Sequence, residues 1–271
     1  MQTILRGLLT GEAPLIMGIL NTTPDSFSDG GHFFQLDSAI QQAEQLIADG
    51  ADIIDVGGES TRPGAQDVSQ EKELDRVIPV IEALRQYGVP ISIDTSKAHV
   101  MEHAIKAGAC MVNDVRALQE DGAVEVVAKY GVEVCLMHMQ GQPRSMQQSP
   151  AYNNVTQEVI TFLQQRVEAC VGAGIDYNQI CIDPGFGFGK TLENNCQLMK
   201  ELSEFKKLQL PLLIGVSRKS MIGDILDVPV NDRLIGSIAA AQFALHSGAN
   251  ILRVHDVKET AHMVHIYQAF K

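Results

Sequence analysis

Eight short runs of apolar and β-branched residues recur along the chain, each followed by a segment with helical spacing. The runs are LIMGIL at 15–20, DIIDV at 52–56, ISID at 91–94, CMVND at 110–114, VEVCLM at 132–137, ICID at 180–183, LLIGV at 212–216 and NILRV at 250–254. Strands that alternate with helices predict a parallel sheet. Eight repeats in 271 residues, near the ~250 typical of the class, favour an α/β fold with a closed (β/α)8 TIM barrel over an open doubly wound sheet.

The helical segments end in a way that suits short connections to the next strand. Many of them close with Gly followed by a small or apolar residue, at Gly50, Gly88, Gly108, Gly131, Gly174 and Gly248. Gly is favoured there because it adopts the left-handed conformation that ends a helix. We expect a single barrel domain over residues 14–271, with residues 1–13 as a small N-terminal cap across the barrel bottom.

Charge and cysteine usage restrict the class of protein. A net charge of −12 argues against a general binder of nucleic acid or of anionic membranes, because such proteins depend on excess Lys and Arg. No apolar run approaches the ~20 residues that cross a bilayer, and Arg6 interrupts the only early apolar cluster, unlike a signal peptide. Five cysteines without CxxC spacing predict buried, reduced thiols and a cytoplasmic location.

Every predicted strand ends in polar or ionisable residues. The carboxyl ends of barrel strands meet around one mouth, so these residues should share a pocket although they are distant in sequence. A single Asx residue after a strand commonly caps a helix or shapes a turn, and the prediction therefore depends on all eight exits together. The exits carry Asn21, Asp55, Asp94, Asn113 with Asp114, His138, Asp183, Ser217-Arg218-Lys219, and Arg253 with His255.

The cationic members of this set predict an anion site. Arg62, Lys219, Arg253 and His255 suit a phosphate or diphosphate, and Asn21 suits a metal ion that accompanies it. The alternative is a group of solvated surface cations.

The acidic and amide members predict a second group. Asp94, Asn113 and Asp183 suit the donor edge of a flat nitrogen heterocycle in a half-buried pocket; the alternative is helix capping. His138 lacks an HxH or HxxxH partner, so packing is favoured over metal binding.

Three loops carry unusual composition. DPGFGFGKT at 183–191 is not a P-loop, because the pattern needs Gly where Pro184 stands, and a dinucleotide fingerprint needs Gly where Lys190 stands. NTTPDSFSDGG at 21–31 and ESTRPGA at 59–65 predict turns. Such loops at a barrel mouth often act as lids; plain surface loops are the alternative.

Eight segments at the strand exits, in order, resemble the bacterial dihydropteroate synthases. The segments are NTTPDSFSDGG, IDVGGESTRPGA, SIDTSK, VNDV, MHMQGQP, IDPGFGFGKT, GVSRKSMIG and LRVHDV. The resemblance implies a (β/α)8 enzyme of folate synthesis that joins 6-hydroxymethyl-7,8-dihydropterin diphosphate to 4-aminobenzoate. It also implies Mg2+, a homodimer, and sulfonamides as competitors.

The resemblance further implies roles for individual residues, with Asn21 at the metal and diphosphate position. Contacts to the diphosphate fall on Thr61, Arg62, Arg253 and His255, and contacts to the pterin on Asp94, Asn113, Asp183 and Lys219. The 4-aminobenzoate region falls on Thr61, Pro63, Phe188, Ser217 and Lys219, closed over by Phe27 and its loop. The catalytic residues fall on Asp94, Lys219 and Arg253.

The implied reaction is a dissociative substitution in which cations and Mg2+ stabilise the departing diphosphate while Asp94 and Asp183 stabilise a cationic pterin. Three other functions stay open: a methyltransferase that passes the methyl group of methyl-tetrahydrofolate to a corrinoid protein, a non-catalytic pterin-binding paralogue, and a metal-dependent aldolase. The first needs neither Arg62 nor the Ser217-Arg218-Lys219 segment. The second predicts loss of Asn21, Arg62, Arg253 or the first loop, all of which are present. The third predicts a cluster of His and carboxylate ligands or a Schiff-base lysine on a strand, and the sequence pattern offers neither.

Overall fold

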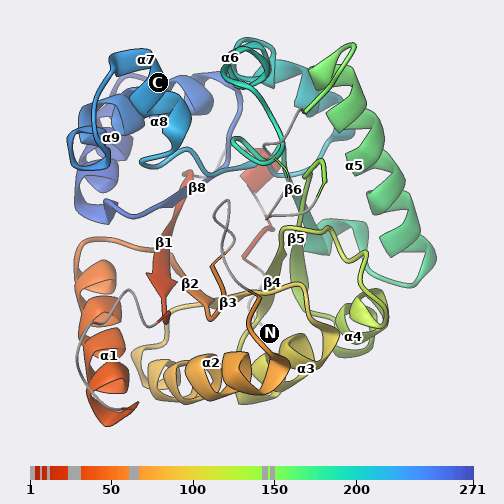
Figure 1. The fold of residues 1–271 in the computed structure, drawn as a ribbon, viewed down its shortest axis with the longest axis vertical. Coiled ribbons are helices and arrows are strands. Elements are labelled where there is room, and N and C mark those ends of the chain that lie inside the picture. The colour runs from red at the N-terminus through yellow and green to blue at the C-terminus, as the bar shows by residue number, and fades with distance from the viewer. Residues whose placement is uncertain are drawn as a thin grey trace.

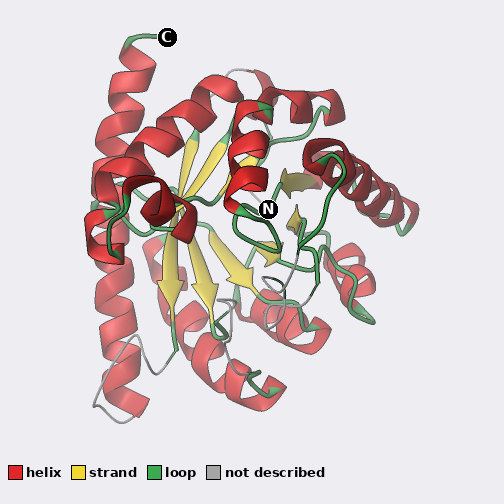
Figure 2. Cartoon of the chain, turned by 45° about the horizontal axis from the view of Figure 1, so that its top comes forward, coloured by secondary structure: helices red, strands yellow, loops and turns green. Residues whose placement is uncertain are grey.

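The computed structural model describes residues 4–6, 8–10, 13–23, 32–60, 67–141, 146 and 150–271. Within them, eight parallel strands form the inside of the molecule and helices surround them (Figures 1 and 2). The strand order is β6-β5-β4-β3-β2-β1-β8-β7, and a bridge between Ile182 and Leu212 joins the two ends of this order. The prediction of a (β/α)8 barrel is therefore confirmed.

The elements alternate along the chain as the sequence pattern predicts. The strands are β1 (Leu15–Asn21), β2 (Ile53–Gly57), β3 (Ile91–Asp94), β4 (Met111–Asp114), β5 (Glu133–Met137), β6 (Ile180–Asp183), β7 (Leu213–Ile214) and β8 (Ile251–Val254). The α-helices are α1 (His32–Ala48), α2 (Gln70–Leu84), α3 (Ala98–Ala107), α4 (Ala123–Tyr130), α5 (Val155–Gly172), α6 (Leu192–Lys200), α7 (Ser220–Leu226), α8 (Leu234–Ser247) and α9 (Val257–Ala269).

Strand β7 is shorter than the predicted run of 212–216. The chain leaves the sheet after Ile214, and the N–H of Lys219 donates to the carbonyl of Val216 at 3.2 Å in a turn. Arg218 has a left-handed φ of 56° within that turn. Val216 follows the strand but is still buried, which is why the residue at this position is apolar. An apolar run therefore does not show where the strand ends and the turn begins.

Glycine ends the helices where the sequence predicts it. All six predicted glycines have left-handed φ angles, from 61° at Gly131 to 130° at Gly108. Helix α6 shows the matching device at its start, where the side chains of Thr191 and Asn194 form a capping box. These local signals place each helix end next to the following strand.

The amino end of the barrel is filled by apolar side chains. Leu5 and Leu8 pack against a buried cluster that includes Met17, Ile53 and Met111. The N–H of Leu5 also donates to Glu133 Oε1 at 2.9 Å. Chemistry is thus confined to the opposite, carboxyl end of the strands.

The five cysteines are free thiols, and three of them are buried. Within the described ranges, no helix combines the length and the apolar character needed to cross a membrane.

Candidate active site

An arginine from β8 joins two carboxylates across the barrel mouth. Arg253 Nε donates to Asp55 Oδ2 on β2 at 2.6 Å, and Arg253 Nη2 donates to Asp94 Oδ2 on β3 at 2.6 Å. Asn113 on β4 donates from Nδ2 to the same Asp55 oxygen at 3.1 Å. Four strand exits therefore share one hydrogen-bonded network.

Asp55 is the centre of this network, and the sequence reasoning did not include it among the site residues. Its side chain is fully buried at 0% exposure, and Asp55 Oδ1 has no hydrogen-bond partner among the described residues. A carboxylate costs free energy in such a place unless it is paired. The signal in the sequence is an Asp inside the apolar run IIDVG; the strand-exit pattern predicts that it lies at the mouth but assigns it no ligand.

Burial sets the charge states in this network. Desolvation raises the pKa of Asp94 from 3.8 to about 7, although the Arg253 guanidinium opposes the shift. Burial disfavours the charge on Arg253 too, but the carboxylates of Asp55 and Asp94 more than compensate and raise its pKa. Arg253 is therefore a permanent cation, while Asp94 is a carboxyl group that titrates near neutrality.

A second pair lies at the ends of β6 and β7. Asp183 Oδ1 accepts from the Gly185 N–H at 2.7 Å, and burial raises the pKa of Asp183 while Lys219 opposes this. Lys219 Nζ donates to the Phe186 carbonyl and lies 4.7 Å from the centre of the Phe188 ring. Burial lowers the pKa of Lys219 to about 8, with the Asp183 carboxylate acting against the shift.

Two members of the predicted cationic set also lie beside carboxylates of the predicted acidic group or of β2. Arg253 forms ion pairs with Asp55 and Asp94, and Lys219 lies close enough to Asp183 to affect its pKa. The physical reason is that a buried charge needs an opposite charge nearby. The cations at the neighbouring exits of β7 and β8 are consequently balanced by carboxylates from β2, β3 and β6.

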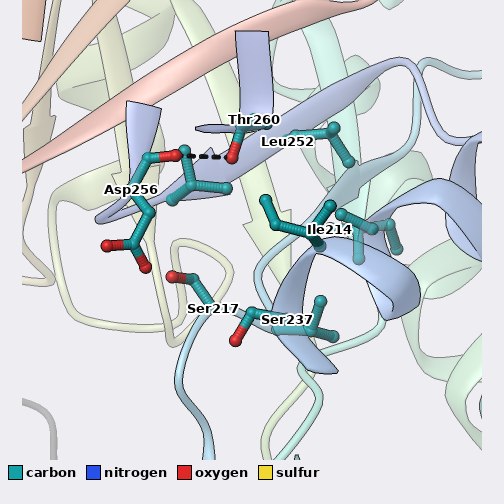
Figure 3. A pocket seen from close by; sticks show the side chains of 10 residues that line it. Ile214, Ser217, Ser237, Leu252, Asp256 and Thr260 are labelled. Atoms are coloured by element: carbon teal, nitrogen blue, oxygen red, sulfur yellow. Dashed lines mark hydrogen bonds between the residues drawn. The ribbon is translucent and has the colours of Figure 1, made fainter. Parts of the chain in front are cut away.

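Ser217 and His255 connect the seventh and eighth exits. Ser217 Oγ accepts from the His255 N–H at 3.2 Å and lies 3.1 Å from His255 Nδ1. Behind Ser217 is a small cavity, about 10 Å³, whose lining includes Ser237, Asp256 and Thr260; the Thr260 hydroxyl donates to the Asp256 carbonyl at 2.7 Å (Figure 3). This volume suffices for about one water molecule, so the cavity is no ligand site.

Two glycines lie next to the predicted site residues at the barrel mouth. A Cβ on Gly57 would lie 3.7 Å from both Asn21 Oδ1 and Asp94 Oδ2, and one on Gly215 would lie 4.0 Å from Lys219 Nζ. Asn21 and Asp94 thus face a common space that a methyl group would fill. The predictions from sequence did not include either glycine in the site.

The residues around Gly57 can be tested for fit to a magnesium ion. Within the described ranges, no group of three or more His, Cys, Asp or Glu residues is arranged to hold a metal. Mg2+ commonly takes only one or two protein oxygens and completes its shell with water and substrate phosphates. Asn21 Oδ1, one neutral oxygen that lies 3.7 Å from the Cβ position of Gly57, fits that coordination.

Four predicted site residues lie outside the described residues, namely Phe27, Thr61, Arg62 and Pro63. The remaining predicted residues come together from six strands at the same end of the barrel: Asn21, Asp94, Asn113, Asp183, Ser217, Lys219, Arg253 and His255, with Phe188 beside Lys219. The prediction that His138 serves packing agrees with its burial and with its edge-on contact to Phe162, whose ring centre is 4.9 Å away.

A parallel barrel with paired charges at the carboxyl ends of its strands defines the molecule as a (β/α)8 enzyme that handles a polar ligand. The family model described as "Pterin binding enzyme" matches residues 17–255. The Haemophilus influenzae dihydropteroate synthase is 54% identical over 259 residues, covering 95% of this chain and 94% of that protein. The chain therefore belongs to the dihydropteroate synthase family of pterin-binding enzymes.

Solved structures agree with this membership. The Yersinia pestis dihydropteroate synthase, in complex with a sulfonamide drug, superposes with a TM-score of 0.91 at 54% identity, covering 97% of this chain and 95% of that one. The Xanthomonas albilineans enzyme with 4-aminobenzoic acid has a TM-score of 0.91 at 47% identity and coverages of 96% and 93%. The same organism's enzyme with 7,8-dihydropteroate has a TM-score of 0.87 at 43% identity and coverages of 96% and 94%.

Proposed function

We propose that the pocket at the carboxyl end of the barrel condenses 6-hydroxymethyl-7,8-dihydropterin diphosphate with 4-aminobenzoate to give 7,8-dihydropteroate and diphosphate. This is the activity of a dihydropteroate synthase, a transferase of folate biosynthesis. The observation that carries the proposal is the network in which Arg253 joins Asp55 and Asp94, in a chain 54% identical to a dihydropteroate synthase.

The pterin binds among the acidic and amide groups. Asp94, Asn113 and Asp183 accept and donate hydrogen bonds at the edge of the ring, and Lys219 donates from the opposite side. Their burial makes these bonds stronger than in water. Because burial raises the pKa of both Asp94 and Asp183, each carboxylate gains from the positive charge that develops on the pterin as the C–O bond breaks.

The diphosphate binds beside Arg253, with His255, Thr61 and Arg62 as further contacts. The ion pairs of Arg253 with Asp55 and Asp94 use Nε and Nη2, and a guanidinium has five N–H donors. Nη1 is then available to donate to a diphosphate oxygen. Held rigidly by two carboxylates, Arg253 stabilises the leaving group without having to reorganise.

Asn21 would hold Mg2+ through its side-chain oxygen, together with the diphosphate of the substrate. When bound, the ion neutralises charge on the leaving diphosphate as a Lewis acid. Asn21 supplies a neutral oxygen ligand, and the missing side chain of Gly57 leaves room for the ion.

4-Aminobenzoate binds over Phe188, with Ser217 and Lys219 near its carboxylate and Phe27, Thr61 and Pro63 closing the subsite. Lys219 Nζ lies 4.7 Å from the Phe188 ring centre, so one aromatic face and one cation adjoin each other there. Sulfonamides compete for the same subsite. The C–O bond to diphosphate breaks first and leaves a cationic pterin methylene. The neutral aniline nitrogen then bonds to that carbon, and the aniline proton leaves to solvent or diphosphate.

The test is formation of dihydropteroate by the purified protein, followed by chromatography together with diphosphate release. Product should require both substrates and Mg2+, and a chelator should abolish it. Pterin binding without product under any condition would instead support a non-catalytic paralogue. Methyl transfer from methyl-tetrahydrofolate to a corrinoid protein would support the methyltransferase.

The protein also forms a homodimer in this proposal. Helices α7, α8 and α9 lie side by side at one corner of the barrel (Figure 1). They expose Ile225, Ile235 and Phe243, with Ile235 at 82%. Such a surface suits a second copy of the chain. Sedimentation should give a dimer that Ile235→Glu converts to monomer and Val171→Glu, an exposed apolar position on α5, leaves intact.

We place the reaction in the cytoplasm, because all five cysteines are free. Reduced thiols are typical of that compartment.

A further inference from the structure

A buried lysine side chain holds the loop that follows β6. Lys190 is only 2% exposed. Its Nζ donates to the carbonyl of Gly185 at 2.9 Å and to that of Phe188 at 3.1 Å, and it lies 2.9 Å from His138 Nδ1. These partners come from two strand exits, because His138 follows β5 directly.

Burial lowers the pKa of Lys190 to about 7, with the Asp183 carboxylate acting against the shift. In the protonated form, the number of donors matches the number of near acceptors. A lysine ammonium has three N–H donors, and the two carbonyls and His138 Nδ1 are three acceptors. Burial, and then the nearby Lys190 cation, lower the pKa of His138 to about 3, so its ring is neutral. Its proton is therefore on Nε2, and Nδ1 accepts from Lys190.

The loop can wrap this closely only because it contains glycines. Gly185 and Gly189 have left-handed φ angles of 70° and 61°. A Cβ on Gly185 would lie 1.9 Å from the His138 carbonyl oxygen, and one on Gly189 would lie 2.3 Å from the Gln140 carbonyl oxygen. The loop is pressed against the end of β5, with two of its own carbonyls directed at Lys190.

The same loop forms one wall of the proposed second-substrate subsite. The Phe186 carbonyl accepts from Lys219 Nζ, and the Phe188 ring lies beneath that ammonium. A Cβ on Gly187 would lie 3.4 Å from Lys219 Cδ. Any shift of the loop would thus move the aromatic wall and release a contact of Lys219.

We propose that Lys190 is a positioning residue for the 4-aminobenzoate subsite, acting through the carbonyls of Gly185 and Phe188 on the place of Phe188 and Lys219. The inference rests on the proposed function. It explains why a P-loop-like Gly-Lys-Thr ending occurs where no phosphate binds: Lys190 binds its own loop, and Thr191 caps α6.

The experiment compares Lys190→Met, which keeps the chain length and removes the ammonium, with the control Lys129→Met, whose side chain is 65% exposed on α4. In Lys190→Met the KM for 4-aminobenzoate should rise by about 10-fold or more, since small displacements of a positioned group cost up to ~10²-fold. The Kd of the pterin diphosphate, measured by calorimetry without the second substrate, should stay unchanged. His138→Phe should raise the same KM by a smaller factor, because it removes one acceptor and keeps an aromatic ring.

An unchanged KM for 4-aminobenzoate in a folded Lys190→Met protein would overturn the inference. Equal weakening of both substrates would also overturn it, because that is the result of a purely structural role. If the Met variant does not fold, Lys190→Gln is the second variant, because it retains two N–H donors. It should also raise the KM for 4-aminobenzoate and leave the Kd of the pterin diphosphate unchanged, but by a smaller factor.

A readout independent of activity separates this inference from the proposed function. 4-Fluorophenylalanine placed at Phe188 should give a 19F resonance that moves in Lys190→Met and stays in place in Lys129→Met. If the unsubstituted protein makes no dihydropteroate and the resonance still moves in Lys190→Met, the proposed function is refuted and the positioning role is retained. A resonance that stays in place in both variants would refute the positioning role itself.

Discussion

Replacing Asp94 with Asn removes one charge from the site while preserving the shape of the side chain. Asp94 Oδ2 is 2.6 Å from Arg253 Nη2, and the carboxylate faces the space above Gly57. An Asn oxygen can still accept from Arg253, so the variant chiefly loses negative charge. Removing a preorganised electrostatic group typically costs about 10²–10³ in rate, or about 2.7–4 kcal/mol, and we expect a loss of this size in kcat.

The Asp94→Asn variant should lose activity without losing stability at pH 8. Burial raises the pKa of Asp94 from 3.8 to about 7, so folding favours the protonated form. The contribution of Asp94 to stability is therefore fully present below pH 3.8 and is lost as the pH rises through about 7. A neutral Asn avoids this loss, and Arg253 keeps its ion pair with Asp55. At pH 8 the unfolding free energy should be equal to that of wild type or higher.

The assay is steady-state dihydropteroate formation at pH 8, combined with urea unfolding of the same preparations. Asp52→Asn is the control, because the exposed Asp52 directly precedes β2, at the opposite end of that strand from the site, and accepts from the Ile16 N–H at 2.8 Å; partial desolvation raises its pKa as well. A near-normal kcat in Asp94→Asn would refute the electrostatic role. Equal losses of kcat in both Asn variants would show that the effect is structural.

Three further results are expected. For wild type, kcat/KM for the pterin diphosphate should rise with pH through about 7 as Asp94 loses its proton, and a flat profile between pH 6 and pH 8 would contradict this. Gly57→Ala places a methyl group 3.6–3.7 Å from Asp94 and Asn21, an ordinary contact distance, so the thermal unfolding temperature should be unchanged. The Mg2+ concentration for half-maximal activity should rise. An unaltered Mg2+ titration would show that Asn21 does not bind the metal. Asp55→Ala leaves Arg253 with one carboxylate, and breaking such a buried pair should lower the unfolding free energy by about 3–5 kcal/mol in urea titrations. A change below about 1 kcal/mol, which is the size typical of solvent-exposed ion pairs, would mean that Asp55 is not the centre of the network.

Local sequence signals determined the order and type of the elements in this protein. Short apolar runs and helical spacing separate strands from helices, and glycines such as Gly108 and Gly248 end helices in left-handed conformations as predicted. The position of a polar residue at the end of a strand is equally local. Once eight strands are assigned, barrel geometry alone gathers Asp94, Asn113 and Asp183 at one end.

Only the tertiary structure decided which of these groups pair and in which charge state they are held. Nothing in DIIDV distinguishes Asp55 as the partner of Arg253, which is 198 residues away, and nothing in GFGFGKT directs Lys190 inward to carbonyl oxygens rather than outward to an anion. The spacing of side chains along a helix or strand follows the period of its backbone, so it can be recognised in the sequence. Ion pairing and pKa shifts depend on distances across the barrel and on exclusion of water, and both arise only when the eight strands close around a common interior.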